Sequence, residues 1–418
     1  MTNFGLFYFF IVFFLQLLAL TITVIFAKVS CLMKIAMIGQ KGVPSQFGGI
    51  ETHVTELATR LVRAGNDVTA YVRPWYATET SDKYNGINIK ILPSIRTKHL
   101  DTISHTFFAT LHACLVLRPD VIHFHGVGPS LLSWIPKILR PSAIVITTFH
   151  CIDRGHAKWG AFARAALHLG EKFCVKFAHE TIAVSKTLTS YISMSYNRRV
   201  TYIPNGITPR RVATDSLLLR PFGLESFGYI AMVSRLVKHK GAHTLISAWK
   251  QACVARPELF KDLKLAIVGD SVFTDKYVAQ LRSQAGDDDS IVFTGYQRGD
   301  VLQALFAGAK FIVHPSVSEG LPIAVLEAMS YGKTVLAADI PENMEVIAEH
   351  GVAFSAGSVE ELVQKLIELV QDEMLCASIG HVAREFVETN YHWDDIGKET
   401  IKVYEKHVSL REGVLAIR

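Results

Sequence analysis

Short apolar runs alternate along most of the chain with segments whose apolar positions recur every three or four residues. The first apolar run covers residues 34–39 and is followed by a glycine-rich loop. The next segment has four apolar residues on one helical face: Ile50, Val54, Leu57 and Leu61. Short buried strands that alternate with amphipathic helices are typical of α/β folds with parallel sheets. Further strands in this half are predicted at residues 67–72, 121–125, 143–148, 181–185 and 200–203.

A second strand–loop–helix series begins at Tyr229, where Tyr-Ile-Ala-Met-Val-Ser-Arg resembles the Lys-Ile-Ala-Met-Ile-Gly-Gln of the first strand. The periodicity lapses between residues 207 and 227, which predicts a linker, and residues 393–408 form a final amphipathic helix. Two doubly wound units in sequence present loops at their carboxyl strand edges, and the cleft between them is the expected ligand site. The other strands of this half are predicted at residues 265–269, 291–294, 310–314 and 335–338.

Residues 4–27 are uncharged and strongly apolar, and no Asp, Glu, Lys or Arg precedes Lys28. As a helix rising about 1.5 Å per residue, this stretch would span about 36 Å, enough to cross a hydrocarbon core of about 30 Å. Lys28 and Lys34 follow it, which predicts that the rest of the chain stays on the cytoplasmic side. We therefore predict a single N-terminal transmembrane anchor within residues 1–32. The alternatives are an upstream translation start before Met33 or a cleaved leader.

The overall composition narrows the class of protein. The chain has 418 residues, 50% hydrophobic and 19% charged, which excludes disordered and disulfide-stapled proteins. A net charge of +5 suits anionic phosphates or lipid surfaces, and because the chain has no long lysine–arginine block we expect no nucleic-acid partner. Six scattered cysteines without a Cys-x-x-Cys pair indicate reduced thiols in a cytosolic body.

The most informative local pattern is His-Pro-Ser-Val-Ser-Glu-Gly-Leu-Pro-Ile-Ala-Val-Leu-Glu at residues 314–327. A strand ends where this segment begins, and Pro322 stands where proline suits the first turn of a helix. Free N–H groups at a helix start favour an anion such as a diphosphate. Because proline has no N–H, the donors would be Gly320, Leu321 and Ile323.

Two carboxylates flank this predicted helix start. Glu319 lies in the loop just before it, and Glu327 lies about two turns further along the same side. A carboxylate beside a diphosphate site is well placed to accept hydrogen bonds from sugar or ribose hydroxyls. The spacing alone also allows a second interpretation, in which Glu327 is a solvated helix residue and Glu319 a cap.

A basic loop, Ser-Arg-Leu-Val-Lys-His-Lys-Gly at residues 234–241, follows the first strand of the second unit. Arg235 and Lys240 flank its turn at the carboxyl edge of the sheet. Two fixed cations there would bind a diphosphate and stabilise it further as a leaving group. Taken alone, this segment is more simply explained as a solvated basic loop.

The first unit has a glycine-rich loop at residues 39–51, in which Gly48 and Gly49 open a helix. The spacing differs from the dinucleotide Gly-x-Gly-x-x-Gly, which disfavours a nicotinamide-dependent oxidoreductase. Two glycines at a helix start let backbone approach a phosphate closely. A tight strand–helix turn is the alternative.

In combination, these motifs resemble a known family. Together they look like the family-4 retaining glycosyltransferases of GT-B fold, which have two Rossmann-like, doubly wound parallel-sheet domains facing a cleft. The segments Thr-Phe-His-Cys-Ile-Asp around His150 and Ile-Pro-Asn-Gly around Asn205 are similar to the subgroup that builds bacterial surface polysaccharides. The motifs are Glu-x7-Glu at Glu319 and Glu327, Arg-x4-Lys at Arg235 and Lys240, and Gly-Gly-x-Glu at Gly48, Gly49 and Glu51.

The resemblance implies a donor-binding and catalytic role for several residues. Arg235 and Lys240 would bind the donor diphosphate. Glu319 would contact the transferred sugar, and Glu327 would contact the ribose hydroxyls. Gly320 and Leu321 would also belong to the donor-binding residues.

The resemblance also implies contacts from the first unit and a mechanism. Gly48 and Gly49 would approach the phosphate, and His150 would line the cleft near the reacting sugar. The leaving diphosphate would help to deprotonate the acceptor on the same face, so no divalent metal or other cofactor is required. In this chain Leu-Pro replaces the commoner Phe-Gly after Glu-Gly, which leaves the identity of the sugar open.

Two further patterns could indicate a metal and have simpler explanations. Residues 287–289, Asp-Asp-Asp, match the Asp-x-Asp metal motif of the other major glycosyltransferase fold, but they lie in a polar turn and are interpreted as solvated. His123 and His125 could, with His150, suggest zinc. Because no cysteine or carboxylate completes that set, we interpret them as cleft-lining or core histidines and predict no metal site.

The sequence therefore predicts a membrane-associated, retaining glycosyltransferase that moves a hexose-type sugar from a nucleotide-diphosphate-sugar donor to a lipid-linked or growing glycan acceptor in polysaccharide biosynthesis. Its expected location is the cytoplasmic face of the inner (plasma) membrane. The alternatives are a nucleotide-sugar epimerase on the same fold and a catalytically silent subunit of a polysaccharide assembly complex.

The predicted organisation follows from these assignments. It comprises a leader at 1–32, an N-terminal acceptor-side domain at 33–206, a linker at 207–227, a C-terminal nucleotide-sugar-binding domain at 228–390, and a C-terminal helix at 391–418 that packs back on the N-terminal domain.

Overall fold

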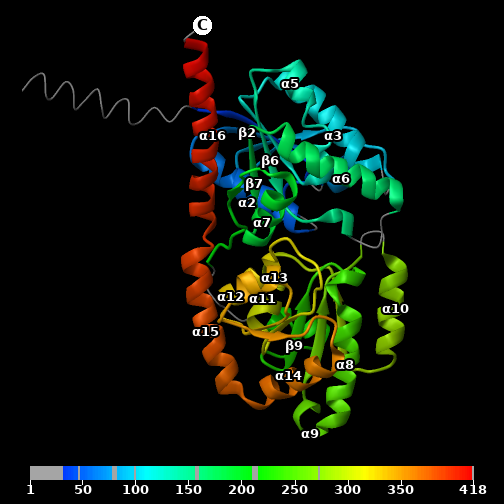
Figure 1. The fold of residues 1–418 in the computed structure, drawn as a ribbon. Helices are drawn as coiled ribbons and strands as arrows, with labels where there is room; N and C mark the ends of the chain where they lie inside the picture. The colour runs from blue at the N-terminus through cyan, green and yellow to red at the C-terminus, as the bar shows by residue number, and fades with distance from the viewer. Residues whose placement is uncertain are drawn as a thin grey trace, which may run out of the picture.

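The structure is a computed structural model that describes residues 32–45, 48–77, 82–97, 100–155, 160–209, 215–271 and 274–416. It contains two parallel-sheet α/β domains, the first above the second in Figure 1. This arrangement confirms the predicted pair of doubly wound units. The predicted transmembrane anchor falls on residues outside the described part of the chain and stays a prediction.

The first sheet has, within the described residues, eight strands in the order β3-β4-β2-β1-β5-β6-β7-β8. Its central strands β1, β5 and β6 are buried along almost their whole length, as parallel strands covered on both faces require. The neighbouring strands pair in parallel, except that β3 pairs antiparallel with β4. The strands are β1 Lys34–Ile38, β2 Asp67–Val72, β3 Lys83–Tyr84, β4 Ile87–Ile91, β5 Val121–His125, β6 Ile144–Phe149, β7 Glu180–Ala183 and β8 Thr201–Tyr202.

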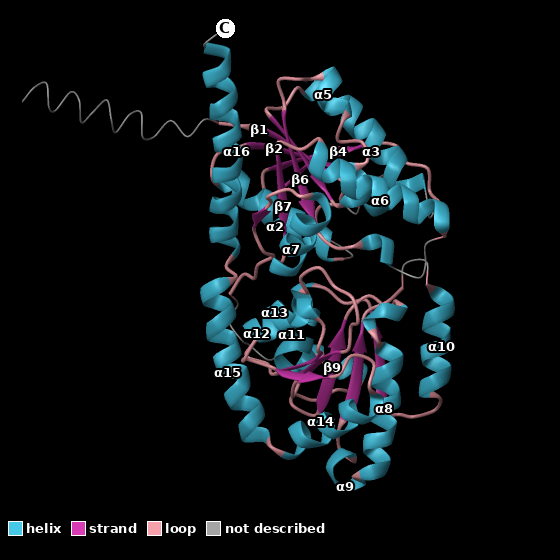
Figure 2. Cartoon of the chain, viewed as in Figure 1, coloured by secondary structure: helices cyan, strands magenta, loops and turns pink. Residues whose placement is uncertain are grey.

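Helices cover both faces of this sheet (Figure 2). One of them passes into a π-helical segment, and together they form the stretch Leu100–Leu117, which is long and apolar enough to cross a membrane. Its Ala109, Ala113 and Cys114 are buried in a cluster with side chains of β2 and β5, as expected of a helix that covers a sheet. The helices are α2 Gly49–Arg63, α3 Leu100–His112, α4 Val127–Ser130, α5 Ile135–Leu139, α6 Ala161–Lys176 and α7 Lys186–Tyr196, and the short helical turns are Pro74–Tyr76, Ala113–Leu117 and Asp153–Gly155.

The second sheet has six described strands in the order β11-β10-β9-β12-β13-β14, all paired in parallel. The strands are β9 Tyr229–Val233, β10 Lys264–Val268, β11 Ile291–Gly295, β12 Ile312–His314, β13 Val335–Ala338 and β14 Val352–Phe354. The helices are α8 Ala242–Ala255, α9 Pro257–Phe260, α10 Asp275–Ala285, α11 Gly299–Gly308, α12 Ile323–Ser330, α13 Pro341–Ile347, α14 Val359–Gln371 and α15 Glu373–Asn390, and the short turns are Ser216–Leu218, Arg220–Phe222 and Lys238–Lys240.

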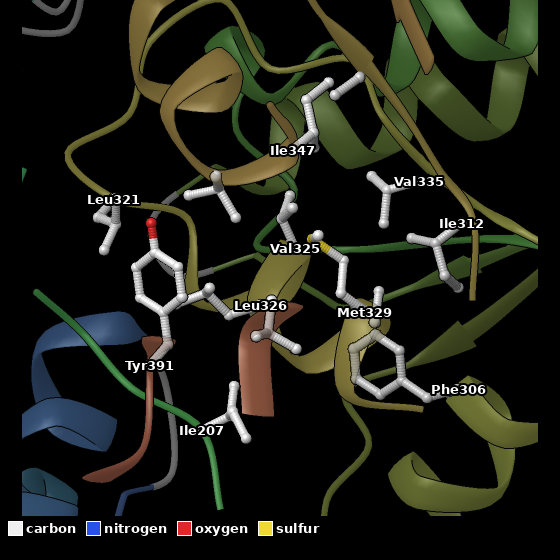
Figure 3. Close-up of a cluster of buried hydrophobic side chains, with 14 of the residues drawn as sticks. Ile207, Phe306, Ile312, Leu321, Val325, Leu326, Met329, Val335, Ile347 and Tyr391 are labelled. Carbon is white, nitrogen blue, oxygen red and sulfur yellow. The ribbon is translucent and has the colours of Figure 1, made fainter. Parts of the chain in front are cut away.

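Helix α12 is anchored in the largest apolar cluster among the described residues. Figure 3 shows Val325 and Met329 side by side, with Ile312 of β12 beyond them. Val325, Leu326 and Met329 are fully buried, so this short helix is held by packing along most of its surface. The loop that precedes it is therefore presented from a rigid support.

The chain returns to the first domain at its C-terminal end. Helix α15 lies along the second domain, and α16 (Trp393–Ala416) continues beside the first domain and packs against α2 (Figure 1). Trp393 and Tyr404 of α16 are buried in the cluster under the first sheet. The Tyr404 hydroxyl lies 2.6 Å from Nδ1 of His123 on β5.

Candidate active site

Glycine holds the basic loop of the second domain against the segment that carries Glu319. Gly241 has a φ of +77°, and a Cβ built there would overlap the carbonyl oxygen of Pro315. The backbone N–H of Val317 donates to the carbonyl oxygen of His239 at 2.9 Å. The basic loop and the Glu319 loop therefore form one surface at the carboxyl edge of the second sheet.

Glu319 lies on that surface between two nitrogen partners. Its Oε1 forms an ion pair with Nζ of Lys240 and lies 2.8 Å from Nε2 of His314. Burial alone would raise the pKa of this carboxyl group, but the Lys240 charge and the hydrogen bond with His314 outweigh burial and hold the pKa well below its usual range. Glu319 is therefore a fixed anion, joined to one of the two cations that the sequence assigned to a diphosphate.

Arg235 follows β9 at the same sheet edge, and its side chain is exposed. The charge of Arg235 acts on Lys41 of the first domain, a residue that the sequence pattern marks only as part of the glycine-rich loop. Burial is the main cause that lowers the pKa of Lys41, Glu51 raises it, and the charge of Arg235 lowers it further. Cations from both domains thus converge on the cleft, and Lys41 is a site residue that sequence reasoning missed.

The predicted glycine-rich helix start is confirmed. Gly48 precedes α2 with a φ of +104°, a conformation that L side chains rarely adopt. A Cβ on Gly49 would come within 3.5 Å of Cδ1 of Ile323, the first residue of α12. The N-termini of α2 and α12 therefore lie next to each other across the cleft, both directed at the space between the domains.

The backbone of His150 contacts the Glu319 loop, called the donor loop from here on, at Gly320. His150 follows β6, and a Cβ built on Gly320 would overlap its carbonyl oxygen. The Asn205 side chain also bridges the domains, because its Nδ2 donates to the carbonyl oxygen of Leu321 at 2.9 Å. The structure thus brings His150, Glu319, Gly320 and Leu321 together, as the motifs predict.

Glu327 lies further along α12, in a small pocket between the domains. The pocket is lined by residues from α2, the linker, α12 and the start of α16: Thr52, Glu56, Gly206, Ile207, Thr208, Ile323, Glu327, Ser330, Tyr331 and Trp393. Helix α12 begins one residue later than expected, with Pro322 as its N-cap. Neither carboxylate is the cap, so the capping interpretation of Glu319 is wrong.

The two patterns that could have indicated a metal, the acidic run at residues 287–289 and the three histidines, differ in the structure. Asp288 accepts hydrogen bonds from the backbone N–H and the hydroxyl of Ser290, so the acidic run is the expected turn before β11. His123 is paired through both ring nitrogens, with Tyr404 and with Thr148 at 2.7 Å. His125 and His150 instead converge with His53 of α2.

Each half of the chain matches a model of a known protein family. The model of the glycosyl transferases group 1 matches residues 223–386, and the model of glycosyltransferase family 4 matches residues 47–211. Over 398 residues, the chain is 28% identical to an uncharacterized glycosyltransferase of Methanocaldococcus jannaschii, covering 89% of this chain and 98% of that one.

Two further relatives extend the comparison. The gpi3 subunit of the phosphatidylinositol N-acetylglucosaminyltransferase of Schizosaccharomyces pombe is 25% identical, with 86% of this chain and 78% of that protein covered. Among solved structures, HepE of Anabaena in complex with UDP and glucose superposes with a TM-score of 0.74 at 21% identity, covering 89% of this chain and 99% of that one. This superposition shows that the present chain and HepE share the same two-domain fold.

Proposed function

The chain belongs to the glycosyltransferases of group 1 and family 4, and from this premise we propose that it transfers a sugar, with retention, from a nucleoside-diphosphate-sugar donor to a lipid-linked or growing glycan acceptor. The observation that carries the proposal is the meeting of Glu319, Lys240 and the Gly320 backbone with His150 across the cleft. The bound UDP and glucose of the HepE structure support a donor of this class.

On this proposal the donor diphosphate lies over the basic loop. Arg235 and Lys240 bind its oxygens, and the backbone N–H groups of Gly320 and Leu321 add donors at the start of α12. Glu319, held as an anion by its own partners, accepts hydrogen bonds from the transferred sugar. Glu327 contacts the ribose hydroxyls, and Gly48 and Gly49 let the first domain approach the phosphates.

The reaction moves one proton and one sugar. The acceptor hydroxyl forms a bond to the anomeric carbon while the bond from that carbon to the diphosphate oxygen breaks. The leaving diphosphate takes the acceptor proton on the same face, which preserves the configuration. Arg235 and Lys240 stabilise the charge that develops on the diphosphate, so the step as written needs no divalent metal. His150 lines the reacting sugar.

The acceptor and the location form the second part of the proposal. The S. pombe relative is named for transfer to phosphatidylinositol, a lipid acceptor. With the apolar leader at residues 1–32, we propose that this chain works at the cytoplasmic face of the membrane on an acceptor carried by a lipid or a growing glycan.

The test measures donor binding and sugar transfer in matched variants. A thermal-shift screen of nucleoside diphosphates and their sugars identifies the donor, because a ligand of the folded state raises the melting temperature. With that donor, Arg235→Ala should lower kcat by about 10²–10³-fold, as loss of a transition-state charge partner does. Glu327→Ala should raise the KM for the donor. Arg256→Ala and Glu385→Ala, both exposed and remote, are the controls.

Three outcomes would contradict the proposal. Unchanged transfer in Arg235→Ala or Glu327→Ala would remove the assigned roles. A free isomerised donor, formed without acceptor, would indicate an epimerase. Donor binding with neither hydrolysis nor transfer would indicate a silent subunit.

A further inference from the structure

Three histidines from separate elements of the first domain converge beside the donor loop. His53 lies on α2, His125 ends β5, and His150 directly follows β6. All three side chains are buried, and one nitrogen of each ring lies within 4.8 Å of the others. Because β5 and β6 are parallel neighbours, their carboxyl ends bring His125 and His150 to the same edge of the sheet.

The spacing of these rings matches that of three ligands on one metal ion. Nδ1 of His125 and Nε2 of His150 are 3.4 Å apart, and the three ring centroids are separated by 4.7, 5.5 and 5.6 Å. With Zn–N bonds of about 2.0–2.1 Å, tetrahedral geometry places two ligand nitrogens about 3.4 Å apart and their ring centres about 5.2 Å apart. The nitrogen separation between His125 and His150 matches the first value, and the three centroid separations lie within about half an ångström of the second.

Contacts on the outer side of the His53 and His125 rings leave the other nitrogen of each ring facing the common centre. Nδ1 of His53 lies 2.9 Å from Oδ1 of Asn205, an oxygen that can only accept, so this nitrogen carries the proton. Nε2 of His53 is then an acceptor, and it is buried without a hydrogen-bond partner among the described residues. Nε2 of His125 faces Sδ of Met37 at 3.3 Å, which leaves its Nδ1 for the centre.

We propose that His53, His125 and His150 form a binding site for a divalent transition-metal ion of the zinc class, through Nε2, Nδ1 and Nε2 respectively. Three protein ligands leave a fourth position for water or a substrate oxygen. Asn205 is the outer partner that orients His53, as commonly found behind metal-binding histidines, and it also holds the Leu321 carbonyl of the donor loop.

A metal ion bound at this site would inhibit sugar transfer. This consequence rests on the proposed function. A bound ion would occupy a ring nitrogen of His150 and hold that ring against His53 and His125, so that it could no longer move to line the reacting sugar. Sugar transfer is therefore expected to fall as the site fills and to recover when a chelator removes the ion.

The test titrates the full chain with Co²⁺, whose visible absorption is strong in tetrahedral coordination, and then displaces it with Zn²⁺. We expect one such ion per chain. Asn205→Ala should weaken the affinity by about 10–100-fold, the usual cost of losing an outer partner, and His53→Gln should weaken it more. His381→Gln, at an exposed histidine of α15, should bind as the native chain does.

Binding is measured without any sugar donor, so failure of the proposed reaction leaves this test intact. Native-like affinity in both His53→Gln and Asn205→Ala, or absence of the tetrahedral Co²⁺ band in the native chain, would overturn the site. Circular dichroism establishes that each variant is folded, and if His53→Gln is not, Asn205→Ala decides the outcome. Equal inhibition of native chain and His53→Gln by Zn²⁺ would overturn the inhibitory role.

Discussion

Gly320 brings the Glu319 loop against the backbone of His150 in the other domain. Because a Cβ at this position would overlap the His150 carbonyl oxygen, Gly320→Ala must separate the two loops. We expect a loss of about 1–3 kcal/mol in the free energy of unfolding, as for overpacking elsewhere, and a larger loss of sugar transfer. Urea titration and transfer assays measure both. Gly160→Ala is the control, since a Cβ there meets nothing within 4 Å, and equal effects in the two variants would contradict the prediction.

Glu319 also makes the stability of the protein depend on pH. Its folded-state pKa lies below the ordinary glutamate value of about 4.3, so the stability it contributes is present above that value and is lost as the pH falls towards the folded pKa. The native chain should therefore lose more stability than Glu319→Gln between pH 5 and about pH 3. Urea titrations at both pH values measure this difference. Glu385→Gln, at an exposed glutamate, should follow the native chain, and parallel losses in Glu319→Gln would contradict the assignment.

At this scale, the sequence placed Lys240 and Glu319 in loops that follow strands of the second sheet, and His150 directly after a strand of the first sheet. The structure brings these residues together, and their roles in the reaction stay a prediction. The sequence did not show that Glu319 and Lys240 form an ion pair, nor that the charge of Arg235 acts on Lys41 of the other domain. The first depends on how two loops of the second domain pack together and the second on how the domains face each other, and neither has a local pattern in the chain.

Helix α7 of the first domain begins against a carboxylate of the second. Glu345 on α13 accepts hydrogen bonds from the backbone N–H groups of Lys186 at 2.8 Å and Thr187 at 3.3 Å. These are N–H groups of the first helical turn, which have no partner inside the helix, and a negative charge there is favourable. The contact therefore joins the domains through a helix terminus.

Glu345→Ala should lower the free energy of unfolding by about 0.5–2 kcal/mol, the usual cost of losing a helix cap. It should also increase amide exchange at the start of α7, because those N–H groups lose their acceptor. Glu349→Ala, an exposed glutamate just beyond α13, is the control. Unchanged exchange at Lys186 and Thr187 in Glu345→Ala would show that the contact does not stabilise the helix start.

Among the elements, strands with continuous apolar runs were predicted to within two residues, and three strands were not predicted. The missed β4, Ile-Asn-Ile-Lys-Ile, lies near the edge of the first sheet and exposes part of its length, so it lacks the fully apolar run of a central strand. The two-residue β3 and the three-residue β14 are too short to show periodicity. Pairing with a neighbouring strand, which is a tertiary contact, forms them.

At the scale of the whole molecule, we expect that the leader can be removed without disturbing the fold of the rest of the chain. Met33 is 1% exposed and belongs to the core of the first domain, so a chain that starts at Met33 retains this core intact. Such a chain should stay in the supernatant after ultracentrifugation of a lysate and hydrolyse the donor, whereas the full chain should sediment with membranes.

A matched control distinguishes insertion into the membrane from nonspecific hydrophobic association. Phe14→Lys in the full chain places a charge in the middle of the apolar stretch, at a cost of about 2.5–3.5 kcal/mol for insertion. It should shift the protein towards the soluble fraction. Sedimentation of the chain that starts at Met33 to the same extent as the full chain would contradict an anchor in the leader.

The sequence by itself determined the two parallel-sheet domains and the loops at their strand ends, because periodicity and glycine or proline placement are local properties of the chain. Only the tertiary structure decided which of those residues meet. It gathered one ring nitrogen each of His53, His125 and His150 within 4.8 Å of one another, and it joined His123 to Tyr404 of α16 by a hydrogen bond. Such contacts join residues distant in sequence, 281 positions apart for His123 and Tyr404, and depend on how helices and domains pack rather than on any spacing within the chain.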